Sequence, residues 1–151
     1  MATVFGKLNL KDQQQIVILN PPHTFERELA GLGGVQIVRD IKAAKEISFA
    51  LAFVTKQQEV DRLATAIAKK ATGDAVIWFA YPKKTSKNHK SDIERDRGWQ
   101  TLGDLGFEGV RMVAIDEDWT AVRFRRAEYI KALKRDESWA MSKAGKAKAK
   151  K

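Results

Sequence analysis

The chain has 151 residues, no cysteine and a net charge of +9. This length suits one domain with a genuine core. The lack of cysteine excludes disulfides, thiolate zinc sites and a cysteine nucleophile. His23 and His89 form no spaced ligand pair, so we expect no metal site. Since there is no signal-like N-terminus and no apolar run of about 18 residues, we expect a cytoplasmic protein without membrane association.

The positive charge is concentrated at the C-terminal end. Residues 142–151, SKAGKAKAKK, contain five lysines and no acidic residue, so this segment carries about half of the net charge. It has no apolar side chain larger than alanine and cannot bury enough surface to offset its ordering entropy. We therefore expect a single α/β domain over residues 1–141, followed by a disordered tail.

The first half of the chain alternates short apolar runs with turn residues. A strand is expected at 16–19, ending at Asn20-Pro21-Pro22, and Thr24 is the predicted N-cap of a short helix over 25–32. Strands follow at 35–38 and 47–54. The segment 41–46 between them has room for about one helical turn.

The second half begins with the clearest amphipathic helix, predicted over 56–71 with Gly73 as its C-terminal stop. The continuous apolar run 75–80 predicts a central strand, and a basic loop follows at 82–90. A helix is then expected over 92–105. The strands 110–115 and 120–124 form an antiparallel hairpin, and a terminal helix is expected over 126–141.

Strands that alternate with helices predict a mostly parallel sheet with right-handed crossovers. This layout, closed by "LGFEGVRMVAIDEDW" and an antiparallel last strand, resembles the class I methyltransferase-like Rossmann arrangement. The resemblance implies a three-layer fold with about six strands in the order 2-1-3-4-6-5. The motifs "IVILNPP", "WFAYPKKTS" and "VAIDEDWTAVRFRR" resemble, more closely, a family of small uncharacterised bacterial α/β proteins, a likeness that implies fold and location and leaves function open.

The turn after the first strand departs from the methyltransferase pattern. A dinucleotide or S-adenosylmethionine site needs a glycine-rich turn there, so that backbone N–H groups can approach the ligand. Here Pro21 and Pro22 remove two of those donors. Asp40 follows the second strand, where a ribose-binding acid would stand, but this signal alone is weak. We therefore expect no cofactor of this kind.

The predicted topology gathers polar residues at the carboxyl edge of the sheet, the usual place for ligands in open α/β folds. We call this set the polar rim; it consists of Asn20, Thr55, Lys83, Lys84, Ser86, Asp116, Asp118 and Trp119. One interpretation is a site for a small anionic or sugar-bearing ligand, with the lysines as phosphate contacts and Trp119 as a wall. The alternative is that acids and lysines neutralise one another, with Lys83 coupled to Asp116, while Trp119 packs in the core. No nucleophile–base pair stands out, so catalysis stays open.

Alternating lysine and alanine after a compact domain is typical of arms that contact phosphates nonspecifically. The tail lysines Lys143, Lys146, Lys148, Lys150 and Lys151, with Lys87 and Lys90 of the basic loop, are the candidate contacts. Our main interpretation is therefore a non-catalytic protein that binds nucleic acid or another polyanion. The alternative is a degenerate methyltransferase-like enzyme or small-ligand binder that uses the crevice at the carboxyl edge.

Overall fold

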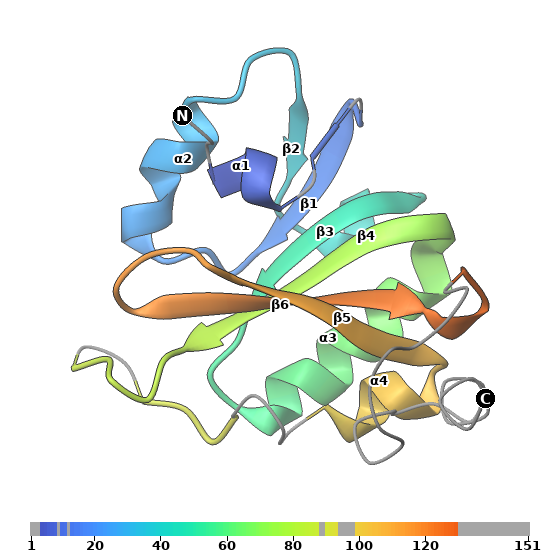
Figure 1. Ribbon diagram of the computed structural model, residues 1–151. Helices are drawn as coiled ribbons and strands as arrows, with labels where there is room; N and C mark the ends of the chain where they lie inside the picture. The colour runs from blue at the N-terminus through green and yellow to red at the C-terminus, as the bar shows by residue number, and fades with distance from the viewer. Residues whose placement is uncertain (1–3, 9, 12, 88–89, 94–98, 130–151) are drawn as a thin grey trace.

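The computed structural model describes residues 4–8, 10–11, 13–87, 90–93 and 99–129. One six-stranded sheet forms its centre, with the order β2-β1-β3-β4-β6-β5, as predicted (Figure 1). Its strands are β1 (Gln15–Leu19), β2 (Gln36–Val38), β3 (Ile47–Phe53), β4 (Ala71–Pro82), β5 (Phe107–Ala114) and β6 (Trp119–Arg126). Every predicted strand is therefore present in the described part of the chain, and β4 is longer than expected.

Strand directions decide which loops meet at the carboxyl edge. β1 pairs in parallel with β2 and β3, and β3 pairs in parallel with β4. β6 is antiparallel to both β4 and β5, and Pro82 at the end of β4 lies opposite Trp119 at the start of β6. The turn of the β5–β6 hairpin thus lies at the same edge as the carboxyl ends of the parallel strands.

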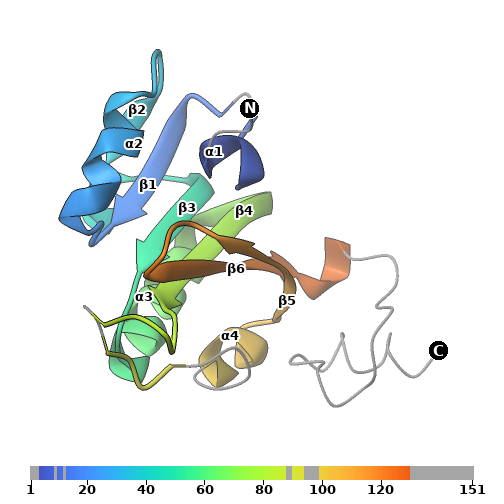
Figure 2. The same cartoon turned by 60° about the vertical axis from the view of Figure 1, so that its left-hand side comes forward.

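Helices cover both faces of the sheet. Helices α1 (Val4–Lys7) and α2 (Glu26–Ala30) lie on one face, and α3 (Gln57–Lys70) and α4 (Gln100–Asp104) lie on the other (Figures 1 and 2). β4 contributes alternate residues to the two cores. Trp78 belongs to the core beneath α1 and α2, whereas Ile77 and Phe79 belong to the core beneath α3. Among the described residues, every helix is too short or too polar to span a lipid bilayer.

Two residues predicted to begin or end a helix do neither. Thr24 is not an N-cap, because it lies inside the 3₁₀ helix η1 (His23–Phe25), which Pro22 precedes with a φ of −68°. Helix α3 ends without help from Gly73, since β4 begins directly after Lys70 and Gly73 lies within that strand at a φ of +55°. Glycine tolerates this left-handed conformation where the pairing of β4 with β3 becomes irregular. The single turn expected over 41–46 is the 3₁₀ helix η2 (Ile41–Ala43).

Two predicted helices after β4 also differ. Asp92 and Ile93 are not helical, and α4 covers five residues of the predicted 92–105, with 94–98 outside the described residues. Asp92 is instead tied to α3, because its Oδ1 accepts a hydrogen bond from Gln57 N at 2.8 Å. β6 continues through Arg126 into the 3₁₀ helix η3 (Ala127–Tyr129). The remainder of the predicted terminal helix, and the tail, lie outside the described residues.

Candidate functional site at the carboxyl edge

The polar rim begins with the residues that follow β1 and β3. Asn20 is exposed and has a left-handed φ of 54°, which Asn tolerates better than most residues. Thr55 is engaged at the start of α3, where its N and Oγ1 donate to Glu59 Oε1 at 2.9 and 3.1 Å. Since its hydroxyl proton is already committed, Thr55 stabilises the helix start.

The loop after β4 and the β5–β6 hairpin are neighbours, as the topology predicted. Lys83 N donates to the carbonyl oxygen of Asp118 at 2.7 Å, and Ser86 Oγ lies 2.8 Å from Asp118 Oδ1. These bonds join two segments that are far apart in the sequence. The structure therefore brings Lys83, Ser86 and Asp118 together, and Lys84 is exposed on the same loop.

Asp116 faces its own turn. Its Oδ1 accepts hydrogen bonds from Asp118 N at 2.8 Å and Trp119 N at 2.9 Å. Within the described residues Asp116 forms no ion pair with Lys83, so the expected coupling of these two side chains has no direct contact behind it. The reason is local, because the two turn amides lie closer to the carboxylate than the lysine ammonium does.

We expect Asp116→Ala to lower the free energy of unfolding by about 1–2 kcal/mol, because two turn amides lose a charged acceptor. Asp116→Asn keeps an acceptor oxygen and should lose less. Glu117→Ala, at the neighbouring exposed position, is the matched control and should change stability by less than about 0.5 kcal/mol. Urea unfolding measures all three variants. Equal losses for Asp116→Ala and Glu117→Ala would contradict this role.

Trp119 is a core residue. It is 4% exposed, and its ring packs edge-on against Phe53 with centroids 5.2 Å apart. The ring belongs to the core beneath α1 and α2. It therefore does not form an open wall for a ligand, and the alternative of core packing is correct. Lys87 and Lys90 are exposed, and the five tail lysines lie outside the described residues.

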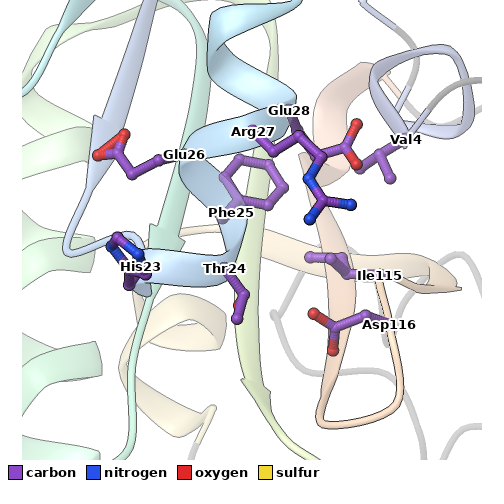
Figure 3. A pocket seen from close by; sticks show the side chains of 9 residues that line it. All are labelled: Val4, His23, Thr24, Phe25, Glu26, Arg27, Glu28, Ile115 and Asp116. Carbon is purple, nitrogen blue, oxygen red and sulfur yellow. The ribbon is translucent and has the colours of Figure 1, made fainter.

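A cavity of about 590 Å³ opens at the carboxyl edge, between the segment after β1 and the β5–β6 hairpin (Figure 3). It is lined by Val4, His23, Thr24, Phe25, Glu26, Arg27, Glu28, Ile115 and Asp116. Asp116 is the polar-rim residue among them. Sequence reasoning did not select the residues of η1 and α2. Their position directly after the first parallel strand was the available signal, because that position lies at the ligand edge.

The cavity has positively and negatively charged side chains around an apolar floor. Figure 3 shows the guanidinium of Arg27 directed toward the hairpin residues Ile115 and Asp116, with Glu26 and His23 on the other side of Phe25. Glu26 is held by Arg39, whose Nη1 and Nη2 donate to its two oxygens at 2.6 and 2.9 Å. These hydrogen bonds lower the pKa of Glu26, so it is a carboxylate at neutral pH.

The turn after β1 and the acid after β2, which would contact the cofactor in a methyltransferase crevice, both differ from the expected pattern. Pro22 leads into a 3₁₀ turn, so the segment after β1 offers neither glycine nor the N–H groups of Pro21 and Pro22. Asp40 Oδ1 accepts from Lys42 N at 3.0 Å and caps η2. Neither Asn20 nor Asp40 lines the cavity. Among the described residues, no group of three His, Cys, Asp or Glu side chains is placed to hold a metal ion.

Comparison with known proteins identifies the fold. No protein-family model matches the chain, and no curated protein matches its sequence. Among solved structures, phosphoethanolamine N-methyltransferase 2 from Haemonchus contortus matches with a TM-score of 0.52 and 13% identity, over 83% of this chain and 38% of that one. Magnesium protoporphyrin IX methyltransferase from Synechocystis PCC 6803, with bound S-adenosylmethionine, matches with a TM-score of 0.50 and 12% identity, over 82% of this chain and 74% of that one.

The chain therefore has the methyltransferase-like Rossmann fold, with an antiparallel strand pair at the C-terminal side of its sheet. Its structural similarity is to the fold of S-adenosylmethionine-dependent methyltransferases. At this level of identity the likeness establishes the fold alone.

Proposed function

We propose that the protein binds a small organic molecule carrying hydroxyl or amino groups, in the cavity between α2 and the β5–β6 hairpin. The observation that carries this proposal is the cavity itself, about 590 Å³ in volume and located at the carboxyl edge. Ligand pockets commonly have volumes of about 300–1,000 Å³ and occur at this edge in open α/β sheets.

The lining supports this ligand class better than a polyanion. The side chains of Val4, Phe25 and Ile115 offer apolar surface, and the carboxylates of Glu28 and Asp116 can accept hydrogen bonds from hydroxyl or amino groups. Arg27 adds one guanidinium that can pair with a carboxylate of the ligand. An uncharged or zwitterionic ligand suits this mixture, because the carboxylates of Glu28 and Asp116 outnumber the one guanidinium of Arg27 and would repel a polyanion.

S-adenosylmethionine and nicotinamide dinucleotides are not the expected ligands, although the fold is that of methyltransferases. Two prolines follow β1, and Asp40 is engaged in capping η2, so the backbone cradle and the free ribose acceptor are both altered. In thermal-shift and calorimetric titrations we expect no binding of either compound. A micromolar dissociation constant for either would show that the turn after β1 still functions as a cofactor loop.

A panel of nucleosides, sugars and amino acids, measured by thermal shift and saturation-transfer NMR, tests the proposal itself. Thr24→Trp places a large ring at the cavity and should abolish a response that the unmodified protein shows. Thr72→Trp is the matched control, because Thr72 is exposed near the start of β4, at the opposite edge of the sheet. A response that survives Thr24→Trp, or that is lost equally in Thr72→Trp, would place the ligand elsewhere.

The proposal includes membership of the family of small bacterial α/β proteins whose motifs the sequence resembles, and a location in the cytoplasm. Nonspecific binding of nucleic acid through the basic loop and tail remains a separate prediction from the sequence. A degenerate methyltransferase activity would require a methyl donor, so the cofactor titration above also tests it.

A further inference from the structure

Three arginines form a cluster on one face of β5 and β6. Arg111 and Arg123 are directly opposite each other in the register of the two strands, and Arg125 follows Arg123 on the same face. This is the face covered by α1, because Ala121, two residues before Arg123, belongs to the core beneath α1. We call Arg111, Arg123 and Arg125 the arginine cluster.

The cluster has more positive than negative charge near it. Arg125 is paired with Asp74, with Nη2 and Oδ2 2.6 Å apart. Within the described part of the chain, Arg111 and Arg123 donate no side-chain hydrogen bond, and the Nε of Arg123 is buried without a partner. Glu108 lies opposite Arg125 in the register and is buried, so the three arginines face two carboxylates, those of Asp74 and Glu108.

The electrostatics of the arginine cluster favours an anion beside it. Burial lowers the pKa of Arg123, and the charges of Arg125 and Arg111 lower it further, against the opposing effect of Asp74. Like charges directly opposite each other destabilise an antiparallel pair. An oxyanion between the exposed Arg111 and the half-buried Arg123 would relieve this repulsion and would accept hydrogen bonds from the terminal N–H groups of their guanidiniums, since the Nε of Arg123 is buried.

We propose that the arginine cluster is a binding site for a phosphate group, with Arg111 and Arg123 as its donors and Arg125, held by Asp74, as a flanking charge. A planar guanidinium can donate two parallel hydrogen bonds to the oxygens of one phosphate group, a geometry that a lysine ammonium does not offer. The site lies toward the end of β6, away from the carboxyl edge. It is therefore independent of the proposed cavity ligand. The phosphate group can belong to a small molecule or to a nucleic acid backbone.

Titration of the full chain with pyrophosphate and with a short DNA duplex, at constant ionic strength, tests the site. We expect a saturable rise in the melting temperature or a saturable binding signal with at least one of these probes. Arg111→Gln and Arg123→Gln should each weaken this binding about tenfold or more. Arg62→Gln is the matched control, because Arg62 is exposed on α3 at the other face of the sheet.

The two probes separate the sources of the phosphate group. A response to pyrophosphate that depends on Arg111 and Arg123 supports a small phosphorylated ligand. If only DNA gives a response, and that response depends on Arg111 and Arg123, the phosphate group belongs to a nucleic acid backbone. Without any anion at low salt, Arg111→Gln should be at least as stable as the unmodified protein, since a repulsion is removed. No response to either probe, equal losses in Arg62→Gln, or a clear destabilisation by Arg111→Gln would overturn the proposal.

Discussion

Trp78→Ala is expected to lower the free energy of unfolding by about 3–5 kcal/mol, the usual range for truncating a buried tryptophan. Trp78 is 0% exposed and lies in the middle of β4, between β3 and β6. Its indole Nε1 also donates to the carbonyl oxygen of Leu8 at 2.7 Å, which fixes the end of α1 to the sheet. The substitution removes packing and this hydrogen bond together.

Trp78→Phe separates the two contributions. Phenylalanine keeps most of the ring packing but leaves the carbonyl of the buried Leu8 without its donor, at an expected cost of about 1–3 kcal/mol beyond the packing loss. In limited proteolysis, the N-terminal segment should then be cleaved faster in Trp78→Phe than in the unmodified protein. Phe79→Leu, on the other face of the same strand, loses packing without touching α1 and is the control. If the N-terminal segment is cleaved at the same rate in Trp78→Phe and Phe79→Leu, the indole hydrogen bond does not anchor α1.

The second large effect concerns the salt dependence of DNA binding. If the five lysines of 142–151 contact duplex phosphates, deleting them should reduce the slope of log affinity against log salt by roughly 4–5 units. Over a roughly fourfold rise in salt, the affinity of the full chain should therefore fall by a factor about 500 times larger than the affinity of the shortened protein. Partial engagement of the tail would give a proportionally smaller change, and the loss should be the same for all DNA sequences.

Affinity measured at several salt concentrations, for the full chain and for residues 1–141, decides this prediction. Circular dichroism is the control, since loss of a segment without large apolar residues should leave the fold intact. Replacing Lys87 and Lys90 by glutamine in both proteins reports the contribution of the basic loop. Equal slopes for the two lengths would remove the tail from the mechanism, and absence of binding by both would reject the nucleic-acid prediction.

Strand positions could be predicted from the sequence pattern and the sheet order from the resemblance to the methyltransferase-like arrangement, whereas several helix boundaries could not be predicted. The apolar run 75–80 has no polar residue, which requires burial on both faces and hence a central strand. Residue preference alone predicts a helix-ending role for Gly73 and a helix-capping role for Thr24. Their actual conformations depend on the pairing of β4 with β3 and on the φ that Pro22 imposes.

The candidate site was predicted in part. The neighbourhood of Lys83, Ser86 and Asp118 followed from topology, because an antiparallel β6 must begin where β4 ends. The direction of each side chain did not follow. Asp116 turns toward two amides of its own hairpin, and Trp119 turns into the core. A crevice at this edge was expected, but most of its lining was not, because the lining needs α1, which no sequence signal predicted, to lie beside α2 and the hairpin.

The sequence by itself determined the layered α/β fold, since hydrophobic periodicity and proline positions act over a few residues and are written directly in the chain. It also determined that the turn after β1 lacks two backbone donors, because proline removes an N–H wherever it stands. Only the tertiary structure decided which side chains meet. The cavity beside Arg27 and Asp116, and the facing pair Arg111 and Arg123, arise from strand register and helix placement, which depend on contacts between residues far apart in the sequence.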